Sequence, residues 1–168
     1  MAGKPAPRAA QRPALRSFGA PLSAEPAAAP HPTQADYRAL AEFRYLIRSF
    51  LEFSQNEARA AGITPRQHQA LLQLKGLPAD VPATIGALAE RLRIRHHSAA
   101  ELADRLTESG LVVRRHDPAD QRRVLLDLTE LAERHLADLS AVHLDELHKM
   151  TGVLDTIVQL ARQHAAKG

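Results

Sequence analysis

Residues 84–128 read TIGALAERLRIRHHSAAELADRLTESGLVVRRHDPADQRRVLLDL, and the spacing of their apolar residues changes half-way. In 85–92 and in about 96–108 the apolar residues recur at helical spacing, and only three residues separate the two runs. Apolar and β-branched runs at 111–116 and 122–128 then stand on either side of DPADQ, which is typical of a turn with a charged tip. This order predicts two short helices joined by a tight turn and followed by a β-hairpin.

Longer helices are predicted on both sides of this stretch. Residues 34–61 have apolar residues on two stripes, where a surface helix needs only one. The stripes are Leu40, Ile47 and Leu51, and Phe43, Leu46, Phe50 and Phe53. Such a helix is buried on two faces, either at the centre of a monomeric core or against a second subunit. After the hairpin we expect two further helices, a long one over 128–149 and a terminal one over 151–168.

The composition excludes several classes of protein. The chain has 168 residues, enough for one domain with or without a tail, and it contains no cysteine, which excludes disulfides, thiolate metal sites and cysteine nucleophiles. Residues 1–33 are rich in proline and alanine and hold four basic residues against one acidic residue, which accounts for the net charge of +3. We expect a flexible arm there, and a soluble, cytoplasmic, nucleoid-associated protein, because no apolar run is long enough for a membrane span or a signal peptide.

Basic residues gather on the two elements that would face DNA in such an arrangement. Arg93 and Arg95 fall at the turn between the short helices, and further arginines follow on the second helix and on both sides of the hairpin tip. A helix fits the major groove of DNA, and a hairpin tip can reach the backbone or the minor groove. The alternative is a solvated basic face without a partner, but this clustering favours double-stranded DNA as the partner.

From Phe43 to about Leu147 the chain resembles the MarR family of winged helix-turn-helix regulators. The resemblance is carried by TIGALAERLRI, SAAELADRLTESGLVVRR, the wing DPADQRRVLL and the LT that follows it. It implies a mainly α fold with a small β-hairpin wing (α+β) and long N- and C-terminal dimerisation helices. The dimerisation region would be 34–62 and 129–168, and the DNA-binding lobe 63–128. The resemblance also implies a homodimeric repressor of a pseudo-palindromic operator, often relieved by a small aromatic ligand between the dimerisation helices and the lobe.

The resemblance also suggests which residues contact DNA. His97, Ser98 and Glu101 match the family's base-contacting positions, and Asp120 and Arg122 match its wing pair, with Arg114 as the expected partner of Asp120. The complete set of candidate DNA-binding residues is Thr84, Arg95, His96, His97, Ser98, Glu101, Arg105, Arg114, Arg115, Asp120, Arg122 and Arg123.

Three positions in this region depart from the family's pattern. Arg93 stands where glycine is common, Arg95 where a helix-capping Ser or Asp is usual, and Glu101 where a basic or small polar residue is usual. Glu101 either accepts a hydrogen bond from a cytosine or pairs with Arg105 one turn along, and the second role is favoured. A capping box of Ser98 with Glu101 is an alternative start for the second helix, which would leave both histidines in the turn.

The histidines do not predict a metal or catalytic site. His96 and His97 point about 100° apart on a helix, so they cannot both face one tetrahedral ion. The chain has no HExxH motif, nucleophile elbow or glycine-rich phosphate loop, so we expect neither enzymatic activity nor a cofactor. The candidates for a ligand pocket are polar residues on the dimerisation helices and the helix next to them: Arg44, Arg48, His68 and His135.

Two other functions remain open from the sequence. One is a winged-helix module that binds a protein instead of DNA, since Glu101 and a body without net charge would discourage DNA binding. The other is a metal-responsive regulator that builds a histidine site across helices or subunits.

Overall fold

The structure is a computed structural model that describes residues 31–118, 120 and 122–165. Along this part of the chain the elements are α1 (Gln34–Ala60), α2 (Pro65–Lys75), α3 (Ile85–Leu92), α4 (His96–Glu108), β1 (Val112–His116), β2 (Val124–Leu128) and α5 (Glu130–Ala165). The fold is mainly α with a small β-hairpin, as the sequence predicts. Except for its last three residues, the predicted arm lies outside the described residues.

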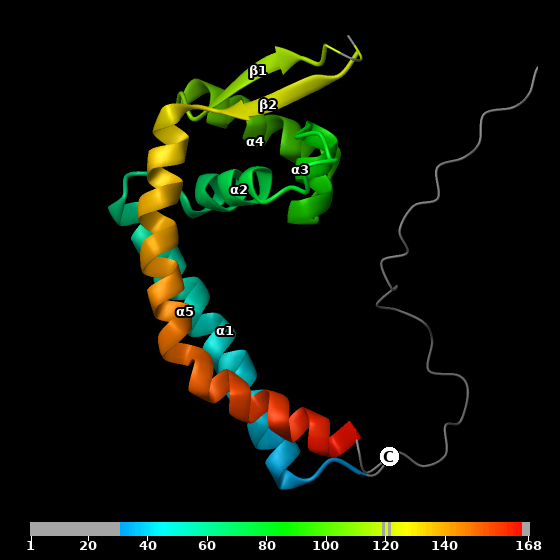
Figure 1. Ribbon diagram of the computed structural model, residues 1–168, viewed down its shortest axis with the longest axis vertical. Helices are drawn as coiled ribbons and strands as arrows, with labels where there is room; N and C mark the ends of the chain where they lie inside the picture. The colour runs from blue at the N-terminus through cyan, green and yellow to red at the C-terminus, as the bar shows by residue number, and fades with distance from the viewer. Residues whose placement is uncertain (1–30, 119, 121, 166–168) are drawn as a thin grey trace, which may run out of the picture.

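The two short helices, α3 and α4, and the hairpin lie where the change of period predicts them. Three residues separate α3 from α4, and β1 pairs with β2 in antiparallel register from Val112 opposite Leu128 to His116 opposite Val124. The hairpin is joined to the helices because the N–H of Leu126 donates to the carbonyl of Ala83 at 2.7 Å. With α2 they form a lobe at one end of the molecule, where the hairpin projects beyond α4 (Figure 1).

A leucine-rich core holds this lobe together. Its largest fully buried side chains come from every element of the lobe and from the loop before β1: Leu71, Leu88, Leu106, Leu111, Val112 and Leu126. Leu102 and Leu106, one helical turn apart, turn the buried face of α4 toward this core, so the opposite face remains exposed. The cost of truncating one such leucine to alanine is about 2–5 kcal/mol, so the core fixes the orientation of α4.

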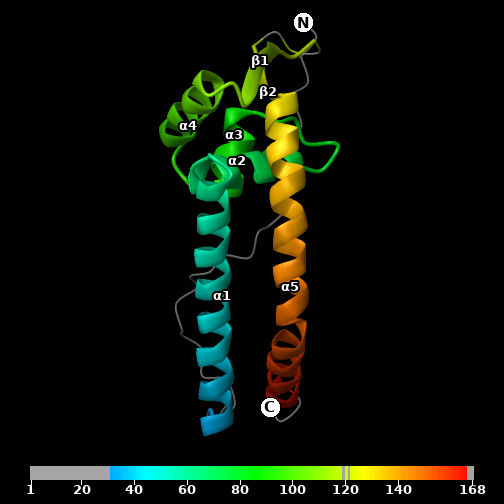
Figure 2. The ribbon, with the colours of Figure 1, turned by 90° about the vertical axis from the view of Figure 1, so that its left-hand side faces the viewer.

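The two long helices, α1 and α5, lie side by side and carry the lobe at one end (Figures 1 and 2). The prediction of two separate C-terminal helices was wrong, because α5 runs without interruption through Gly152. A glycine within a helix costs only about 1 kcal/mol, and the residues after Gly152 continue the apolar pattern at helical spacing. No helix in the described segments is long and apolar enough to cross a membrane.

Much of the apolar surface of the long helices is not covered within the chain. On α1, the side chains of Leu46, Phe50 and Phe53 are half-buried, whereas those of Leu40, Phe43, Ile47 and Leu51 are exposed. On α5 the exposed apolar residues are Leu131, Val142, Leu144, Leu147, Val153 and Val158. One chain therefore covers part of the two-striped helix and leaves the remainder open to solvent.

Candidate nucleic-acid interface

The turn between α3 and α4 contains a backbone conformation that is unusual for its residue. Arg93 ends α3 in the left-handed region, with φ 55° and ψ 41°, and its N–H donates to the end of that helix. Glycine adopts this conformation without the cost that an L side chain meets. The glycine expected from the family's pattern is thus replaced by an arginine that keeps the glycine-type geometry and places a cation at the turn.

Helix α4 begins at His96, so both histidines lie in its first turn. Arg95 is the N-cap residue, and its side chain makes no capping hydrogen bond. A capping box of Ser98 with Glu101 is therefore not the start of this helix. His96 and His97 are exposed at the end of the helix where the backbone N–H groups are free to donate, a position that suits a DNA base edge or phosphate.

Glu101 pairs with Arg105, as predicted from their spacing. The carboxylate lies 3.4 Å from the guanidinium, and the Arg105 side chain also donates to the Glu101 carbonyl at 3.3 Å. Both side chains are exposed, so the pair contributes only a few tenths of a kcal/mol. The acid thus lies beside a cation on the exposed face of α4.

Carboxylates hold three of the wing arginines. Arg114 lies 2.7 Å from Asp104 of α4, and Arg115 lies 2.7 Å from Asp127 of β2. The predicted pairing of Arg114 with Asp120 was wrong, because Arg114 shares the helix-facing side of β1 with the buried Val112 and so meets α4. Arg123 lies 3.2 Å from Asp117.

Asp120 instead organises the wing tip around Arg122. Its carboxylate accepts a hydrogen bond from the backbone N–H of Arg122 at 3.1 Å. The Arg122 side chain is exposed, and within the described segments no carboxylate pairs with it. The same holds for Arg93 and Arg95 at the turn. The candidate interface therefore offers unpaired cations at the two places where a helix-turn-helix and a wing would approach a duplex.

Thr84 is placed differently from the other candidates. Its hydroxyl accepts the N–H of Ala87 at 3.1 Å as the N-cap of α3, and its backbone forms a bridge to Leu125 of the wing. The side chain is only half-buried, but capping occupies its acceptor. Thr84 therefore orients α3 against the wing.

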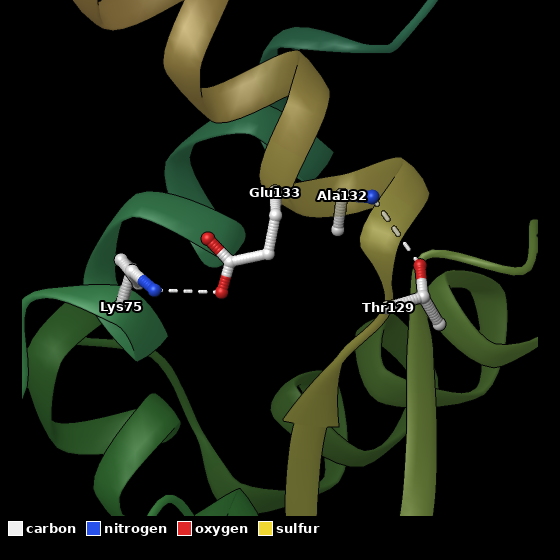
Figure 3. Close-up of polar contacts among 4 residues, drawn as sticks. All are labelled: Lys75, Thr129, Ala132 and Glu133. Carbon is white, nitrogen blue, oxygen red and sulfur yellow. Dashed lines mark hydrogen bonds and ion pairs between the residues drawn. The ribbon is translucent and has the colours of Figure 1, made fainter.

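The first turn of α5 anchors the long helices to the lobe (Figure 3). Thr129 precedes the helix, where its hydroxyl accepts the N–H of Ala132 at 3.2 Å and donates to the carbonyl of Gly110 at 2.8 Å. Glu133, on the same turn, pairs with Lys75 of α2 at 2.7 Å. The loop between α4 and β1 and helix α2 are thus attached to the start of α5.

The four candidates for a ligand pocket are not brought together. Arg44 and Arg48 are exposed on α1, His135 is half-buried on α5, and His68 of α2 is buried. The ring of His68 packs instead against His143 of α5, which the sequence analysis did not select. His143 follows the buried Leu136 and Leu139 at helical spacing, a signal that could have identified it as a buried residue. Within the described segments no group of three or more His, Asp or Glu side chains could hold a metal ion.

Comparison with known proteins identifies the lobe. Residues 61–123 match the MarR family model. This stretch of the chain is similar to the MarR family. The matched residues cover α2, α3, α4 and β1 and end at the wing tip, so they include the turn, the exposed face of α4 and Arg122.

A curated relative supports the same assignment. The HTH-type transcriptional regulator YcgE of Bacillus subtilis is 33% identical over 97 residues, a match that covers 58% of this chain and 61% of the relative's length. The names of YcgE and of MepR describe both proteins as transcription regulators.

Solved structures share the fold. MepR of Staphylococcus aureus is 19% identical with a TM-score of 0.62, and 79% of this chain and 98% of that chain are covered. CouR of Rhodococcus jostii RHA1, bound to p-coumaroyl-CoA, is 23% identical with a TM-score of 0.61, and 78% and 92% are covered. A mutant of S. aureus MepR bound to an oligodeoxyribonucleotide is 17% identical with a TM-score of 0.57, and 82% and 100% are covered.

Proposed function

We propose that the protein is a homodimeric, DNA-binding transcription repressor that recognises a pseudo-palindromic operator in the cytoplasm. The observation that carries this proposal is that the exposed first turn of α4 and three cations without carboxylate partners in the described segments, Arg93, Arg95 and Arg122, occur in the same lobe. In this arrangement α4 enters the major groove, and the wing tip places Arg122 in the adjacent minor groove or on the backbone. The MepR mutant solved with an oligodeoxyribonucleotide has the same fold.

A second copy of the chain would cover the exposed apolar residues of α1 and α5. Between the start of α1 and the end of α5 lies an open, largely apolar groove of about 470 Å³, whose lining includes Leu40, Phe43, Ile157 and Leu160. Apolar surface of this extent on one side of a chain is typical of an interface. Two lobes joined through the long helices of two copies would meet half-sites about one helical turn apart, which is the symmetry of a pseudo-palindrome.

The test is a titration of DNA that flanks the protein's own gene, followed at several salt concentrations. We expect binding that weakens strongly with salt, because each phosphate contact releases counterions. Replacing Arg122 with Ala should weaken binding to all sequences and lower the salt slope by about one for each phosphate that the variant no longer neutralises. The matched control is Arg48→Ala, which removes an exposed arginine from the middle of α1, away from the lobe.

Three results would count against the proposal. They are an absence of binding to any genomic fragment, binding that does not respond to salt, and equal losses of affinity in the Arg122 and Arg48 variants. Light scattering after size-exclusion chromatography should give twice the mass of one chain, and Phe43→Glu should shift it toward the monomer. A chain that is dimeric yet does not bind DNA would favour a protein-interaction module.

Relief of repression by a small aromatic or anionic ligand is part of the proposal. Its support is the fold shared with CouR, which was solved with p-coumaroyl-CoA. The test is release of the bound DNA by a panel of aromatic carboxylates and their thioesters. If no member of the panel changes the DNA affinity while the salt response is as expected, the repressor is not controlled by this class of ligand.

A further inference from the structure

Two buried histidines meet between the lobe and the long helices. His68 of α2 and His143 of α5 have ring centroids 4.9 Å apart, and they are only 3% and 9% exposed. Phe50 and Phe53 of α1 pack edge-on against His143, with ring centroids 5.7 and 5.6 Å away. The cluster therefore joins one helix of the lobe to both long helices.

The hydrogen bonds of His143 leave one place for a proton. Its Nδ1 contacts the carbonyl oxygen of Leu139 on its own helix, so Nδ1 carries the hydrogen of the neutral ring. Its Nε2 is buried and has no hydrogen-bond partner. A proton added to Nε2 would create a cation against two phenyl rings and a second imidazole, with no acceptor for its new N–H.

The surroundings of His68 also oppose a positive charge. Burial lowers the pKa of His68 below its usual value, and a charge on His143 lowers it further. Glu57, one turn after Phe53, is the titratable residue next along this side of α1. Two turns along α2 from His68, Lys75 is already paired with Glu133 of α5. None of these three groups is among the causes of the lowered pKa of His68, so no carboxylate offsets the cost of charging that ring.

We propose that His68 and His143 form an acid-sensitive latch that holds the DNA-binding lobe against the long helices. At neutral pH both rings are uncharged and pack together. In acid, protonation is favourable only where water reaches the rings, which requires α2 to separate from α5. The lobe then loses its fixed position relative to the long helices, and with it the spacing of the two recognition helices in the dimer. The effect on DNA rests on the proposed function, whereas the opening of the latch does not.

Acid favours the open state of the latch, because proton binding and opening are linked. A histidine whose pKa is lower in the closed state binds fewer protons there than in the open state, so the closed state is favoured above the ordinary histidine pKa, near 6.5, and is weakened as pH falls below it. Each proton excluded from the closed state changes the opening equilibrium by up to about tenfold per pH unit.

The first test measures the titration of the histidines in the complete protein by NMR of their imidazole rings. We expect His68 to titrate below the ordinary histidine value, near 6.5, because it is buried beside His143. Signals are assigned with His68→Leu and His143→Phe, and the ordinary value provides the reference if either variant fails to fold. Titration of His68 at or above that value would overturn the latch.

The second test measures DNA affinity at pH 7.5 and 5.5, using the duplex that binds at pH 7.5. We expect the dissociation constant of the unmodified protein to rise in acid, by up to about tenfold, relative to that of the double variant His68→Leu, His143→Phe. His148→Gln, which replaces an exposed histidine on the same helix, should behave like the unmodified protein. Equal pH responses in the unmodified protein and the double variant would overturn the latch. No DNA binding at pH 7.5 would count against the proposed function instead, and the NMR titration would then decide on the latch.

Discussion

The left-handed conformation of Arg93 lowers the stability of the protein, so replacing Arg93 with glycine should raise the free energy of unfolding. A non-glycine residue in this region of φ and ψ costs about 1–2 kcal/mol. Replacing Arg93 with Gly removes that cost. It also gives the unfolded chain additional conformational freedom, which lowers the gain in unfolding free energy by about 0.4–1 kcal/mol. The hydrogen bonds of the turn are made by the backbone N–H of Arg93 to the carbonyls of Ala89 and Glu90, so they persist in the variant. We therefore expect the free energy of unfolding to rise by about 0.5–1 kcal/mol.

The matched control for this change is Arg93→Ala. Alanine also removes the guanidinium, but it keeps the cost of the left-handed conformation, so its stability should stay within about 0.5 kcal/mol of the unmodified protein. The measurement is unfolding in guanidinium chloride and thermal unfolding, both at one protomer concentration, and the melting temperature of the glycine variant should rise by about 1–4 °C. If alanine stabilises as much as glycine, the gain comes from removing charge near Arg91 and Arg95. If glycine lowers the melting temperature, the conformational reasoning is wrong.

Three other changes test the anchor, the core and the exposed face of α4. Thr129→Val removes the capping acceptor for Ala132 and the donor to Gly110 and should cost about 1–2 kcal/mol of unfolding free energy, while Thr129→Ser should recover most of it in the same guanidinium assay. Leu106→Ala leaves a cavity in the core and should cost about 2–5 kcal/mol, and a cost below about 1 kcal/mol would mean that α4 packs less tightly than the structure has it. Glu101→Gln should leave stability within about 0.5 kcal/mol and tighten DNA binding by freeing Arg105, so weaker binding in a gel-shift titration would assign a base contact to the carboxylate.

The sequence predicted those features that neighbouring residues determine. The three-residue turn between α3 and α4, the hairpin and the Glu101–Arg105 pair all depend on spacing within one or two helical turns or strands. The sequence predicted wrongly where a contact depends on how distant elements pack. The partner of Arg114 comes from α4, since the packing of the hairpin on that helix decides it.

The C-terminal helix and the pair of His68 and His143 are two other features that the sequence did not predict. The predicted break between two C-terminal helices does not occur, because a glycine within a helix costs only about 1 kcal/mol, which is small beside the gain from continuing a long helix. His143 was not selected from the sequence, since its partner His68 lies 75 residues earlier and meets it only in the folded chain. The candidate DNA contacts remain predictions, placed by the structure on the exposed side of α4 and on the wing.

The attachment of the first turn of α5 to the lobe gives the long helix mechanical leverage. Its 36 residues span about 54 Å along the helix. Thr129 joins that turn to the loop between α4 and β1, and the Lys75–Glu133 pair joins it to α2, so lobe and helix rotate together while α2 stays packed on α5. A rotation of about 5° at the far end would displace the lobe by about 5 Å, more than the rise of about 3.4 Å for one base pair in B-DNA. In the proposed dimer, a small change in how two copies of α5 pack would be enough to take both α4 helices out of register with successive grooves of DNA.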